Sequence, residues 1–536
     1  MKKYFLSLCL LLSCTSFFGL FQASAAQAPS PTDFHDISAS FAKDAIQRLA
    51  KRGIVSGDGT GAFLPRNSVT RAEFIAMVAR MLKMEPVPND LSAFRDVPKS
   101  AWYYGWVHAG LNLSIVEGNG YRFYPNASIT RQEAAVMVIR AMKDNGYMNG
   151  NTAGQYTDSA SIAEWAWNAV GKATDTGWLQ GSKGQFRPQD AITREETAML
   201  LDRVLQSGNV LTQINLQTPA NVHMGWLYNG TTNQYISYAK RAGLNVLVPR
   251  WYYMEANGKL TDHTDKELLN WAHNNSRQVW AMVGNRGNAE GTHQVLSSAQ
   301  SRKSVVDSIA ANVSRYRLNG INIDFENVMP LPQDRQNLTA FITQLSIEMR
   351  RLGAKLSIDV SPDLNTDWTA AFDYATLGTQ VDYMVLMSYD QHWGGSPIAG
   401  SVSSLPWSES ALRKLLTQVP AKKSIIAYPL YTRDWKIASS VSSEDISLAE
   451  QGHRIRLNKA PLTWNASVAQ YEAAYSSGGI QHRIWTEEAR SLSMKHLMAA
   501  RYPISGYAYW YPGAETIDVW QAIHNAERYA YYSFRI

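Results

Sequence analysis

Three polar residues alternate along one short apolar segment and could together perform acid–base chemistry. The segment NGINIDFE places Asn322, Asp324 and Glu326 two residues apart. In a β-strand, alternate side chains project to one face, and residues at this spacing lie about 6–7 Å apart along the strand. Two carboxylates this close should raise the pKa of one of them, which makes Glu326 a candidate general acid near neutral pH. A solvated strand end is the alternative interpretation.

The residues from 222 onward predict the scaffold that positions these side chains. Short runs of β-branched and aromatic residues alternate with longer amphipathic segments, and the runs begin at residues 222, 244, 278, 320, 355, 381, 423 and 505. This alternation predicts a parallel (β/α)₈ barrel, whose inward-facing residues at the carboxyl ends of the strands line the active-site mouth. Asp324 and Glu326 fall at such an end. The gap before the last strand is too long for one helix, so residues from about 435 to 483 are expected to form a small inserted α+β lobe.

This pattern resembles glycoside hydrolase family 18. The family signature D-G-x-D-x-D-x-E is similar to the segment that ends at Glu326, and the ends of three other predicted strands fit the same family. These ends are MSYD from Met387, YPLYTRDW from Tyr428 and YAYWYPG from Tyr507. The resemblance covers residues 220–530, approximately the whole predicted barrel.

The resemblance implies a role for each matching residue. Glu326 would donate a proton to the leaving oxygen, and Asp324 would orient the N-acetyl group of the substrate. Tyr389 would hydrogen-bond to that group, and Trp510 would form the floor of the subsite. The other substrate-binding residues that the resemblance implies are Asn322, Asp390, Trp226, Tyr431 and Trp435. The acetamido oxygen of the substrate is then the nucleophile, an exception to the usual two-carboxylate scheme. No cofactor and no metal ion are expected.

Two positions depart from the signature, because Asn319 and Asn322 stand where it has aspartates. Asn322 carries no charge, so Asp324 loses a like-charged neighbour that would otherwise share a proton with it. Strands of the GVNIDFEN type are typical of the spore-cortex and peptidoglycan-directed branch of the family, and residues 320–327 are very close to that pattern. We interpret Asn322 as a marker of this branch, with decay of the site as the alternative.

The residues before 206 contain three copies of one unit. FHDI at Phe34 recurs as FRDV at Phe94 and as YTDS at Tyr156, with a repeat length of about 60 residues. After a Gly-rich turn, each copy has a threonine followed three residues later by a glutamate, which predicts a capping box at a helix start. These pairs are Thr70 and Glu73, Thr130 and Glu133, and Thr193 and Glu196. Each unit is therefore a helix, a loop and a capped helix, and the three should pack together to close a core.

The units resemble S-layer homology domains, whose signature ends in TRAE, as at residues 70–73. The predicted copies span 30–85, 90–145 and 152–205, and a linker at 206–221 follows. The resemblance implies binding to pyruvylated secondary cell wall polysaccharide, in which an arginine of each signature could pair with a ketal carboxylate. These arginines are Arg71, Arg131 and Arg194. Salt bridges at the helix starts are the alternative role.

The first residues predict export. Lys2 and Lys3 precede an apolar run, and Ala23-Ser24-Ala25 supplies a small-residue cleavage pattern, which together predict a signal peptide over residues 1–25. A membrane anchor and a lipoprotein signal at Cys14 are the alternatives. Both cysteines of the chain lie in this segment, so no disulfide and no thiolate site is expected after cleavage. A formal charge of +6 over 536 residues does not indicate nucleic-acid binding.

The sequence thus predicts a multidomain protein, in which an all-α trimer of S-layer homology repeats precedes a (β/α)₈ TIM barrel with a small α+β insertion. The expected function is hydrolysis of β-1,4-linked N-acetylglucosamine glycans, with peptidoglycan favoured, at the cell wall of a Gram-positive bacterium. The alternatives are a surface chitinase and a non-catalytic carbohydrate-binding protein on the same barrel. The expected partners are the secondary cell wall polysaccharide and the glycan substrate, without nucleic acid and without a membrane once the signal is cleaved.

Overall fold

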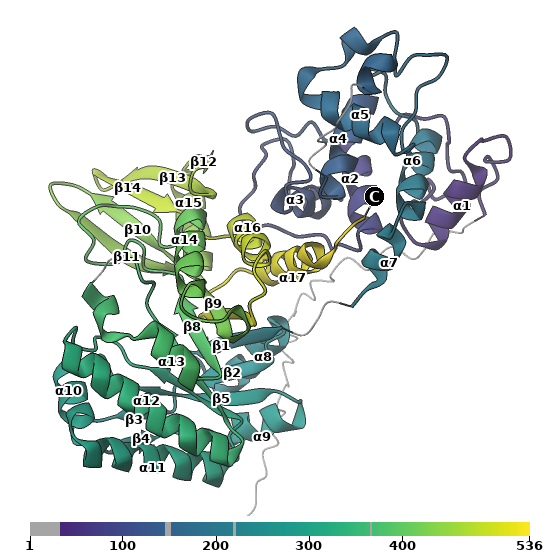
Figure 1. Ribbon diagram of the computed structural model, residues 1–536. Coiled ribbons are helices and arrows are strands. Elements are labelled where there is room, and N and C mark those ends of the chain that lie inside the picture. Colours follow the sequence, from purple (N-terminus) through teal and green to yellow (C-terminus); the bar gives the residue numbers. More distant parts are fainter. Residues whose placement is uncertain (1–32, 145–151, 218–220, 365–366, 536) are drawn as a thin grey trace, which may run out of the picture.

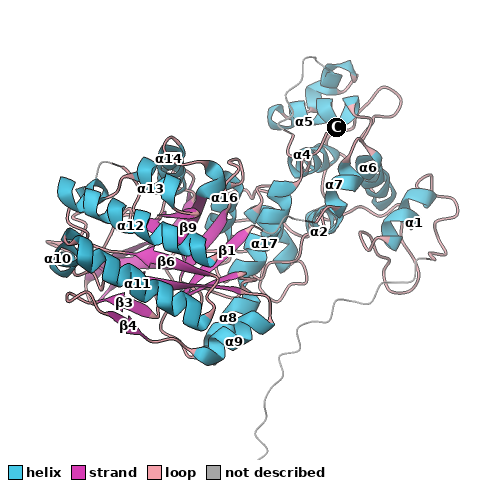
Figure 2. Ribbon diagram, turned by 60° about the horizontal axis from the view of Figure 1, so that its bottom comes forward, coloured by secondary structure: helices cyan, strands magenta, loops and turns pink. Residues whose placement is uncertain are grey.

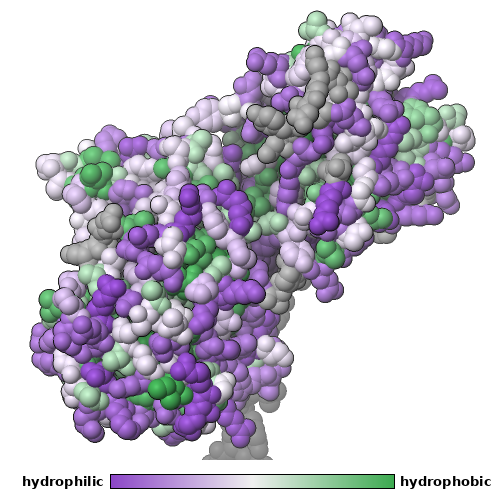
Figure 3. All heavy atoms as spheres, in the orientation of Figure 1, coloured by the Kyte–Doolittle hydropathy of each residue, from purple (hydrophilic) through white to green (hydrophobic). Residues whose placement is uncertain are grey.

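The computed structural model describes residues 33–144, 152–217, 221–364 and 367–535. A helical body formed by the repeats and a barrel lie side by side, with the C-terminal helix between them (Figure 1). The predicted signal peptide lies outside the described residues. Within the described ranges, no helix combines the length and the apolarity needed to cross a membrane. On the face that Figure 3 shows, hydrophilic residues predominate and the hydrophobic ones form small separate groups.

Each repeat contributes a pair of helices. The pairs are α1 (Lys43–Lys51) with α2 (Arg71–Met81), α3 (Tyr104–Asn112) with α4 (Arg131–Ala141), and α5 (Trp167–Asp175) with α6 (Arg194–Gln206). The second helix of every pair begins with the predicted capping box: the threonine hydroxyl accepts from the backbone N–H of the glutamate, whose carboxylate accepts from the backbone N–H of the threonine. Two otherwise unpaired backbone donors are thereby satisfied at each helix start.

The three repeats close into a ring through their backbones. Three backbone hydrogen bonds of 2.9–3.1 Å form this ring. The N–H of Val69 donates to the carbonyl of Ile192, the N–H of Ile192 donates to the carbonyl of Ile129, and the N–H of Ile129 donates to the carbonyl of Val69. All three side chains are fully buried at the centre of one hydrophobic core shared by the repeats. No single unit supplies this core, so the repeats are stable only as a set.

The segment predicted as a linker contains a helix. α7 (Val210–Asn215) follows α6 almost directly, and its Val210 and Ile214 are buried in the core of the repeats. Residues 206–221 were expected to be a linker because they lack helical periodicity and contain Gly, Pro, Asn and Gln. A helix of six residues needs only two buried positions, which a periodicity argument does not detect.

Eight parallel strands form a closed barrel, as predicted. Its strands are β1 (Val222–Leu227), β2 (Val246–Pro249), β5 (Gln278–Gly284), β6 (Gly320–Asp324), β7 (Lys355–Val360), β8 (Tyr383–Met387), β9 (Ser424–Pro429) and β15 (Gly506–Trp510). Neighbours pair in the order β2-β1-β15-β9-β8-β7-β6-β5, and a pairing of β2 with β5 closes the ring. A hairpin of β3 (Tyr252–Met254) and β4 (Leu260–Asp262) extends the sheet beside β5.

Helices surround the strands on the outside (Figure 2). They are α8 (Thr232–Arg241), α9 (Lys266–Asn274), α10 (Ala289–Ser297), α11 (Ala299–Tyr316), α12 (Pro332–Leu352), α13 (Tyr374–Gln380), α14 (Leu405–Leu416), α16 (Ala489–Ala499) and α17 (Asp518–Tyr531). Alternate strand residues pack outward against these helices, whereas an inner cluster that includes Met224, Trp280 and Ile425 fills the barrel. The barrel interior is therefore a packed core below the active-site mouth.

The predicted insertion is a separate lobe between β9 and α16. It comprises β10 (Tyr431–Ile437), β11 (Val441–Ser447), α15 (Leu448–Leu457), β12 (Leu462–Asn465), β13 (Gln470–Ser477) and β14 (Ile480–Trp485). The strands form an antiparallel sheet in the order β11-β10-β14-β13-β12. The lobe begins at Tyr431 rather than near residue 435, because β10 follows β9 with one residue between them.

Helix α17 joins the barrel to the repeats. Its Ala526 and Tyr529 belong to the hydrophobic core of the repeats. The side chain of Asn525 on the same helix binds the backbone of Glu85, accepting from its N–H at 3.0 Å and donating to its carbonyl at 2.7 Å. The two bodies therefore share buried apolar surface and specific hydrogen bonds.

Candidate active site

A cavity of about 870 Å³ opens at the carboxyl ends of the barrel strands. Residues from β1, β6, β7, β8 and β15 line it, and the inserted lobe forms part of its wall. Its polar and aromatic lining includes Trp226, Tyr228, Asp324, Glu326, Asp359, Trp368, Tyr389, Asp390, Trp393, Tyr431, Arg433, Asp445 and Trp510. Eight of the nine residues implied for catalysis or substrate binding lie at this cavity or directly beneath it, on the barrel strands, just after them, or on β10 of the lobe.

The end of β6 presents Asp324 and Glu326 to the cavity. Asp324 closes the strand and is 7% exposed, whereas Glu326 lies two residues beyond and is exposed to the cavity. The side chain of Asn285, which follows β5, fixes the backbone there: it accepts from the N–H of Glu326 at 3.0 Å and donates to its carbonyl at 2.7 Å. Asn285 was missed by the sequence analysis, although its place directly after a strand was visible.

Burial makes Asp324 an unusual carboxyl group. Burial, and after it the negative charge of Glu326, raise the pKa of Asp324 to about 7, although the nearby Arg250 acts in the opposite direction. Removal from water disfavours the charged form of an acid, and a like charge adds to that effect. The raised pKa that crowding predicts thus falls on the residue expected to orient the substrate.

Asn322 lies beneath the pair, fully buried in the barrel. Its Oδ1 accepts from the indole Nε1 of Trp226 at 3.2 Å, and its Nδ2 donates to Asp359 Oδ1 at 2.8 Å and to Ser357 Oγ at 3.0 Å. Asp359 on β7 was missed by the sequence analysis, although the segment KLSIDVS carries it at an inward-facing position. The site thus holds a second buried acid besides Asp324, next to the position where the family signature has one.

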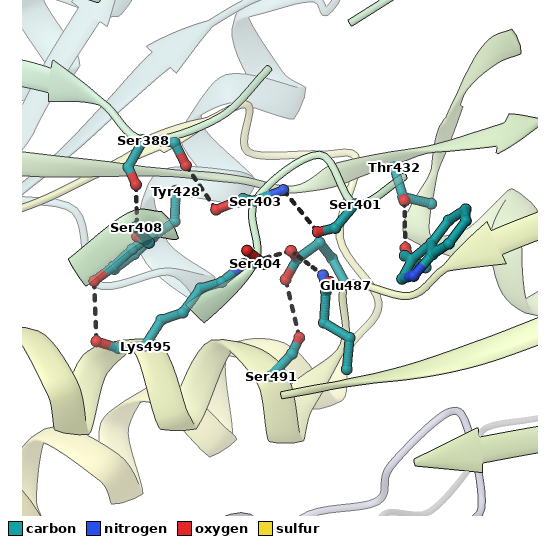
Figure 4. Close-up of polar contacts among 12 residues, drawn as sticks. Ser388, Ser401, Ser403, Ser404, Ser408, Tyr428, Thr432, Glu487, Ser491 and Lys495 are labelled. Atoms are coloured by element: carbon teal, nitrogen blue, oxygen red, sulfur yellow. Dashed lines mark hydrogen bonds and ion pairs between the residues drawn. The ribbon is translucent and has the colours of Figure 1, made fainter. Parts of the chain in front are cut away.

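Strand β8 delivers Tyr389 and Asp390 to the cavity. A buried network behind the strand fixes the following loop: Ser403 Oγ donates to the carbonyl of Ser388 at 2.7 Å, and the hydroxyls of Ser388 and Ser408 lie 2.5 Å apart (Figure 4). Burial and the surrounding acids raise the pKa of Tyr389 well above its ordinary value. Tyr389 is therefore a neutral hydrogen-bonding group across the physiological pH range.

The lobe wall binds Asp390. The hydroxyl of Tyr431 donates to Asp390 Oδ1 at 2.6 Å, and the guanidinium of Arg433 lies 3.7 Å from the same oxygen. Arg433 also pairs with Asp445 at 2.6 Å. Tyr431 and Asp390 thus both line the cavity and are paired with each other.

Aromatic rings form the floor. Trp510 stacks on Tyr228, with centroids 5.5 Å apart and an angle of 29° between the planes, and the edge of Trp226 lies beneath it at 6.0 Å. A cis peptide bond joins Trp510 to Tyr511. Stacked rings of this kind offer an apolar face to a sugar ring.

Trp435 is the one implied substrate-binding residue that the structure does not bring to the cavity. Its side chain is fully buried, and its indole N–H donates to the carbonyl of Gly400, in the loop after β8, at 2.9 Å. Trp435 lies on the same face of β10 as the cavity residues Tyr431 and Arg433, but farther along the strand, where it binds the loop after β8 instead of lining the cavity.

The family model for glycosyl hydrolases family 18 matches residues 214–515, which include the whole barrel strand set and the lobe. The chain belongs to glycosyl hydrolase family 18. The model for the S-layer homology domain matches residues 33–75, 93–135 and 155–198. Three S-layer homology domains therefore precede a family 18 glycoside hydrolase domain, as the sequence motifs predict.

Individual relatives agree with this membership of family 18. The chain is 27% identical to the uncharacterized glycosylase YvbX of Bacillus subtilis over 313 residues, covering 56% of this chain and 90% of that protein. It is 26% identical to the cortical fragment-lytic enzyme of Bacillus anthracis over 244 residues, covering 44% of this chain and 56% of that enzyme. The crystal structure of a chitinase from Chromobacterium violaceum superposes with a TM-score of 0.53 at 25% identity, covering 57% of this chain and 99% of the chitinase.

The signature arginines of the S-layer homology domains lie between repeats. In each of them the Nε donates to the backbone carbonyl of a phenylalanine in another repeat, at 2.7–2.9 Å. The pairs are Arg71 with Phe123, Arg131 with Phe186, and Arg194 with Phe63. Arg71 and Arg131 also pair with the capping-box glutamate of the next repeat, at 2.5 and 3.0 Å. The side chain of Arg131 is 2% exposed, and those of Arg71 and Arg194 are 13% and 12% exposed. The structure thus places all three in the inter-repeat bridges, and binding of wall polysaccharide by them stays a prediction.

Proposed function

We propose that this family 18 enzyme cleaves β-1,4-linked N-acetylglucosamine glycans of the bacterial cell wall, and that its S-layer homology domains hold it there. The reaction is hydrolysis with retention of configuration, in which the substrate's own acetamido group is the nucleophile. Peptidoglycan is the favoured substrate, and chitin is the second candidate.

The observation that carries this proposal is the arrangement of acids in the cavity. Glu326 is exposed to the cavity, and Asp324 lies behind it on the same strand face. The other acids of the lining already have partners: Asp359 accepts from Asn322, and Asp390 and Asp445 contact Arg433. A protein nucleophile needs a free carboxylate opposite the acid, which favours attack by the substrate itself.

The proposed steps use these residues as follows. Glu326 gives its proton to the glycosidic oxygen while the acetamido carbonyl oxygen attacks the anomeric carbon, so that the bond to the leaving group breaks as the ring of an oxazolinium ion forms. Asp324 accepts a hydrogen bond from the acetamido N–H and balances the positive charge. Glu326, now ionised, then takes a proton from water, whose oxygen reopens the oxazolinium ring at the anomeric carbon.

Anchoring favours peptidoglycan. A hydrolase held at the wall by three S-layer homology domains has peptidoglycan within reach. The similarity to a cortical fragment-lytic enzyme supports the same substrate, whereas the similarity to a chitinase supports the second candidate. Peptidoglycan is supported by both the anchoring domains and a similar enzyme, whereas chitin is supported by similarity alone, so we favour peptidoglycan.

Fragments released from the two polymers test the proposal. The full chain is incubated with purified peptidoglycan and with chitin oligomers, and the products are identified by mass spectrometry. We expect muropeptides with a reducing N-acetylglucosamine end. Release from chitin alone would make the enzyme a surface chitinase, and release from neither would favour a carbohydrate-binding role.

A further inference from the structure

We propose that Asp359 is a positioning residue that shares one proton with Asp324, and so replaces across two strands the acid that Asn322 lacks. This inference rests on the proposed function, because it concerns how Asp324 is kept ready for the acetamido group. Asp359 would not touch the reacting atoms.

The register of two strands brings the acids together. On β6 and β7, Asn322 lies opposite Ser357 and Ile323 opposite Ile358, so Asp324 and Asp359 take the next positions along the same ladder. Adjacent strands are about 4.8 Å apart, and residues level with each other project to the same face. Both carboxyl groups lie inside the barrel, with exposed fractions of 7% and 2%.

The hydrogen bonds around Asn322 hold Asp359 in one orientation. Because Asn322 Oδ1 accepts from Trp226, its Nδ2 must point to Asp359 Oδ1, at 2.8 Å. Asp359 Oδ2 is buried and has no hydrogen-bond partner among the described residues. An ionised carboxylate with one unpaired buried oxygen is costly, whereas a proton on that oxygen removes the charge and lets the oxygen donate to the neighbouring Asp324.

The charges that face Asp359 favour its protonated form. Asp324 and Glu326 are presented from β6 and the residues after it, Tyr389 from the end of β8, and Arg250 from the residue after β2. Burial raises the pKa of Asp359 well above its ordinary value, the charge of Asp324 adds to this, and the hydrogen bonds of Asn322 and Trp226 oppose it. Two buried acids side by side cannot both ionise readily, so the pair retains one proton at neutral pH.

The shared proton gives Asp359 a function. When the substrate binds, the shared proton is on Asp359. Asp324 is then ionised and accepts a hydrogen bond from the acetamido N–H of the substrate. Without substrate, the proton can pass to Asp324, which leaves the negative charge on Asp359. The net charge of the pair is −1 in both states, so binding of substrate requires no exchange of protons with solvent.

Exchange of the two side chains tests this directly. In the full chain, Asp359→Asn removes the shared proton, and the double variant Asn322→Asp/Asp359→Asn places an acid and an amide at the same two positions in the opposite order. We expect Asp359→Asn to lower kcat at least ~10-fold and to shift its pH profile by about one unit, since pKa coupling of this size is typical of adjacent buried acids. The double variant should recover most of both losses.

A control and a second readout separate this role from support of the fold. Ser357→Ala removes the other hydrogen bond of Asn322 and should leave the pH profile of kcat unchanged. Infrared absorption of a protonated carboxyl group at neutral pH, present in the wild type and lost in Asp359→Asn, tests the proton without any activity. If the wild type shows this absorption but no activity, the proposed function would be overturned, whereas the proton shared by Asp324 and Asp359 would stand. An unaltered pH profile in Asp359→Asn, or no such absorption in the wild type, would overturn the inference itself.

Discussion

The hydroxyl of Tyr532 donates a hydrogen bond of 2.7 Å to the backbone carbonyl of Leu82, and this bond is buried. Tyr532 directly follows the last barrel helix, and Leu82 directly follows the second helix of the first S-layer homology domain. Residues at opposite ends of the chain therefore belong to one core. Within the described residues, the catalytic domain and the S-layer homology domains therefore share one packed interface.

Loss of this contact should destabilise the anchor. Tyr532→Ala removes a large buried side chain, which typically costs about 3–5 kcal/mol, whereas Tyr532→Phe removes only the hydrogen bond at about 1 kcal/mol. We expect a lower midpoint of thermal unfolding and faster proteolysis of the repeats in Tyr532→Ala. Tyr531→Ala, next to it and 42% exposed, is the matched control. Equal behaviour of the two alanine variants would show that the two bodies are independent.

Glu326→Gln should remove the general acid and keep the shape of the site. We expect hydrolysis of N-acetylglucosamine glycans to fall by ~10²–10⁴-fold, the usual contribution of a positioned acid, while affinity for the glycan changes little. The measurement is kcat together with equilibrium binding of a chitin oligomer. Glu348→Gln on the outer surface of α12, where Glu348 contacts only Arg351 in the described structure, serves as the control. Near-full activity of Glu326→Gln would contradict the assignment of β6.

Asp324 should make stability depend on pH. Its folded pKa of about 7 lies above the ordinary value of 3.8. A group of this kind contributes stability that is fully present below about pH 4 and is lost as the pH rises through about 7, because ionisation in the folded state is disfavoured. We therefore expect Asp324→Asn to unfold at the wild-type temperature at pH 4 and at a higher temperature at pH 8. If the difference in unfolding temperature between Asp324→Asn and the wild type were the same at pH 4 and at pH 8, the raised pKa of Asp324 would be excluded.

Arg131 offers a separate test of the inter-repeat bridges. Its buried guanidinium donates to the carbonyls of Phe186 and Gln180 and to Glu196. Arg131→Ala leaves these acceptors without their partner, and breaking a buried pair typically costs about 3–5 kcal/mol. Arg140→Ala, at an exposed pair with Glu117, should cost less than about 1 kcal/mol. Thermal unfolding distinguishes the two.

Substitution of the two partly exposed arginines, Arg71 and Arg194, tests whether they bind the cell wall. Arg71→Lys and Arg194→Lys keep the charge but lose the forked geometry that suits a carboxylate. If these arginines bind pyruvylated polysaccharide, sedimentation of the full chain with native cell walls should weaken while its unfolding temperature falls only slightly. Binding equal to that of the wild type would restrict them to the inter-repeat bridges.

Much of the fold could be predicted because its signals are periodic. Eight apolar runs separated by longer amphipathic segments specify the barrel, and three capping boxes in register specify the repeats. The helix α7 was missed because six residues with two buried positions show no recognisable period. Trp435 was placed at the cavity from its motif, and it does share a face of β10 with Tyr431 and Arg433, but the loop after β8 covers it there through Gly400.

The site was predictable along one strand and not across strands. Asn322, Asp324 and Glu326 are two residues apart in sequence, so their shared face follows from strand geometry. Asp359 and Asn285 act on these residues from neighbouring strands, and their effect depends on the registers of β5, β6 and β7. A lone aspartate in KLSIDVS has no spacing that marks it as part of a site. Only the pairing of the strands places it beside Asp324.

The central claim, attack by the substrate's own acetamido group, is tested most directly by removing that group. The initial rate of cleavage is measured on purified peptidoglycan strands before and after chemical de-N-acetylation of their N-acetylglucosamine residues. We expect the rate to fall by ~10³-fold or more, because a positioned intramolecular nucleophile contributes many orders of magnitude. Equal cleavage of the two substrates, or a glycosyl ester trapped on a carboxylate of the cavity, would contradict the mechanism.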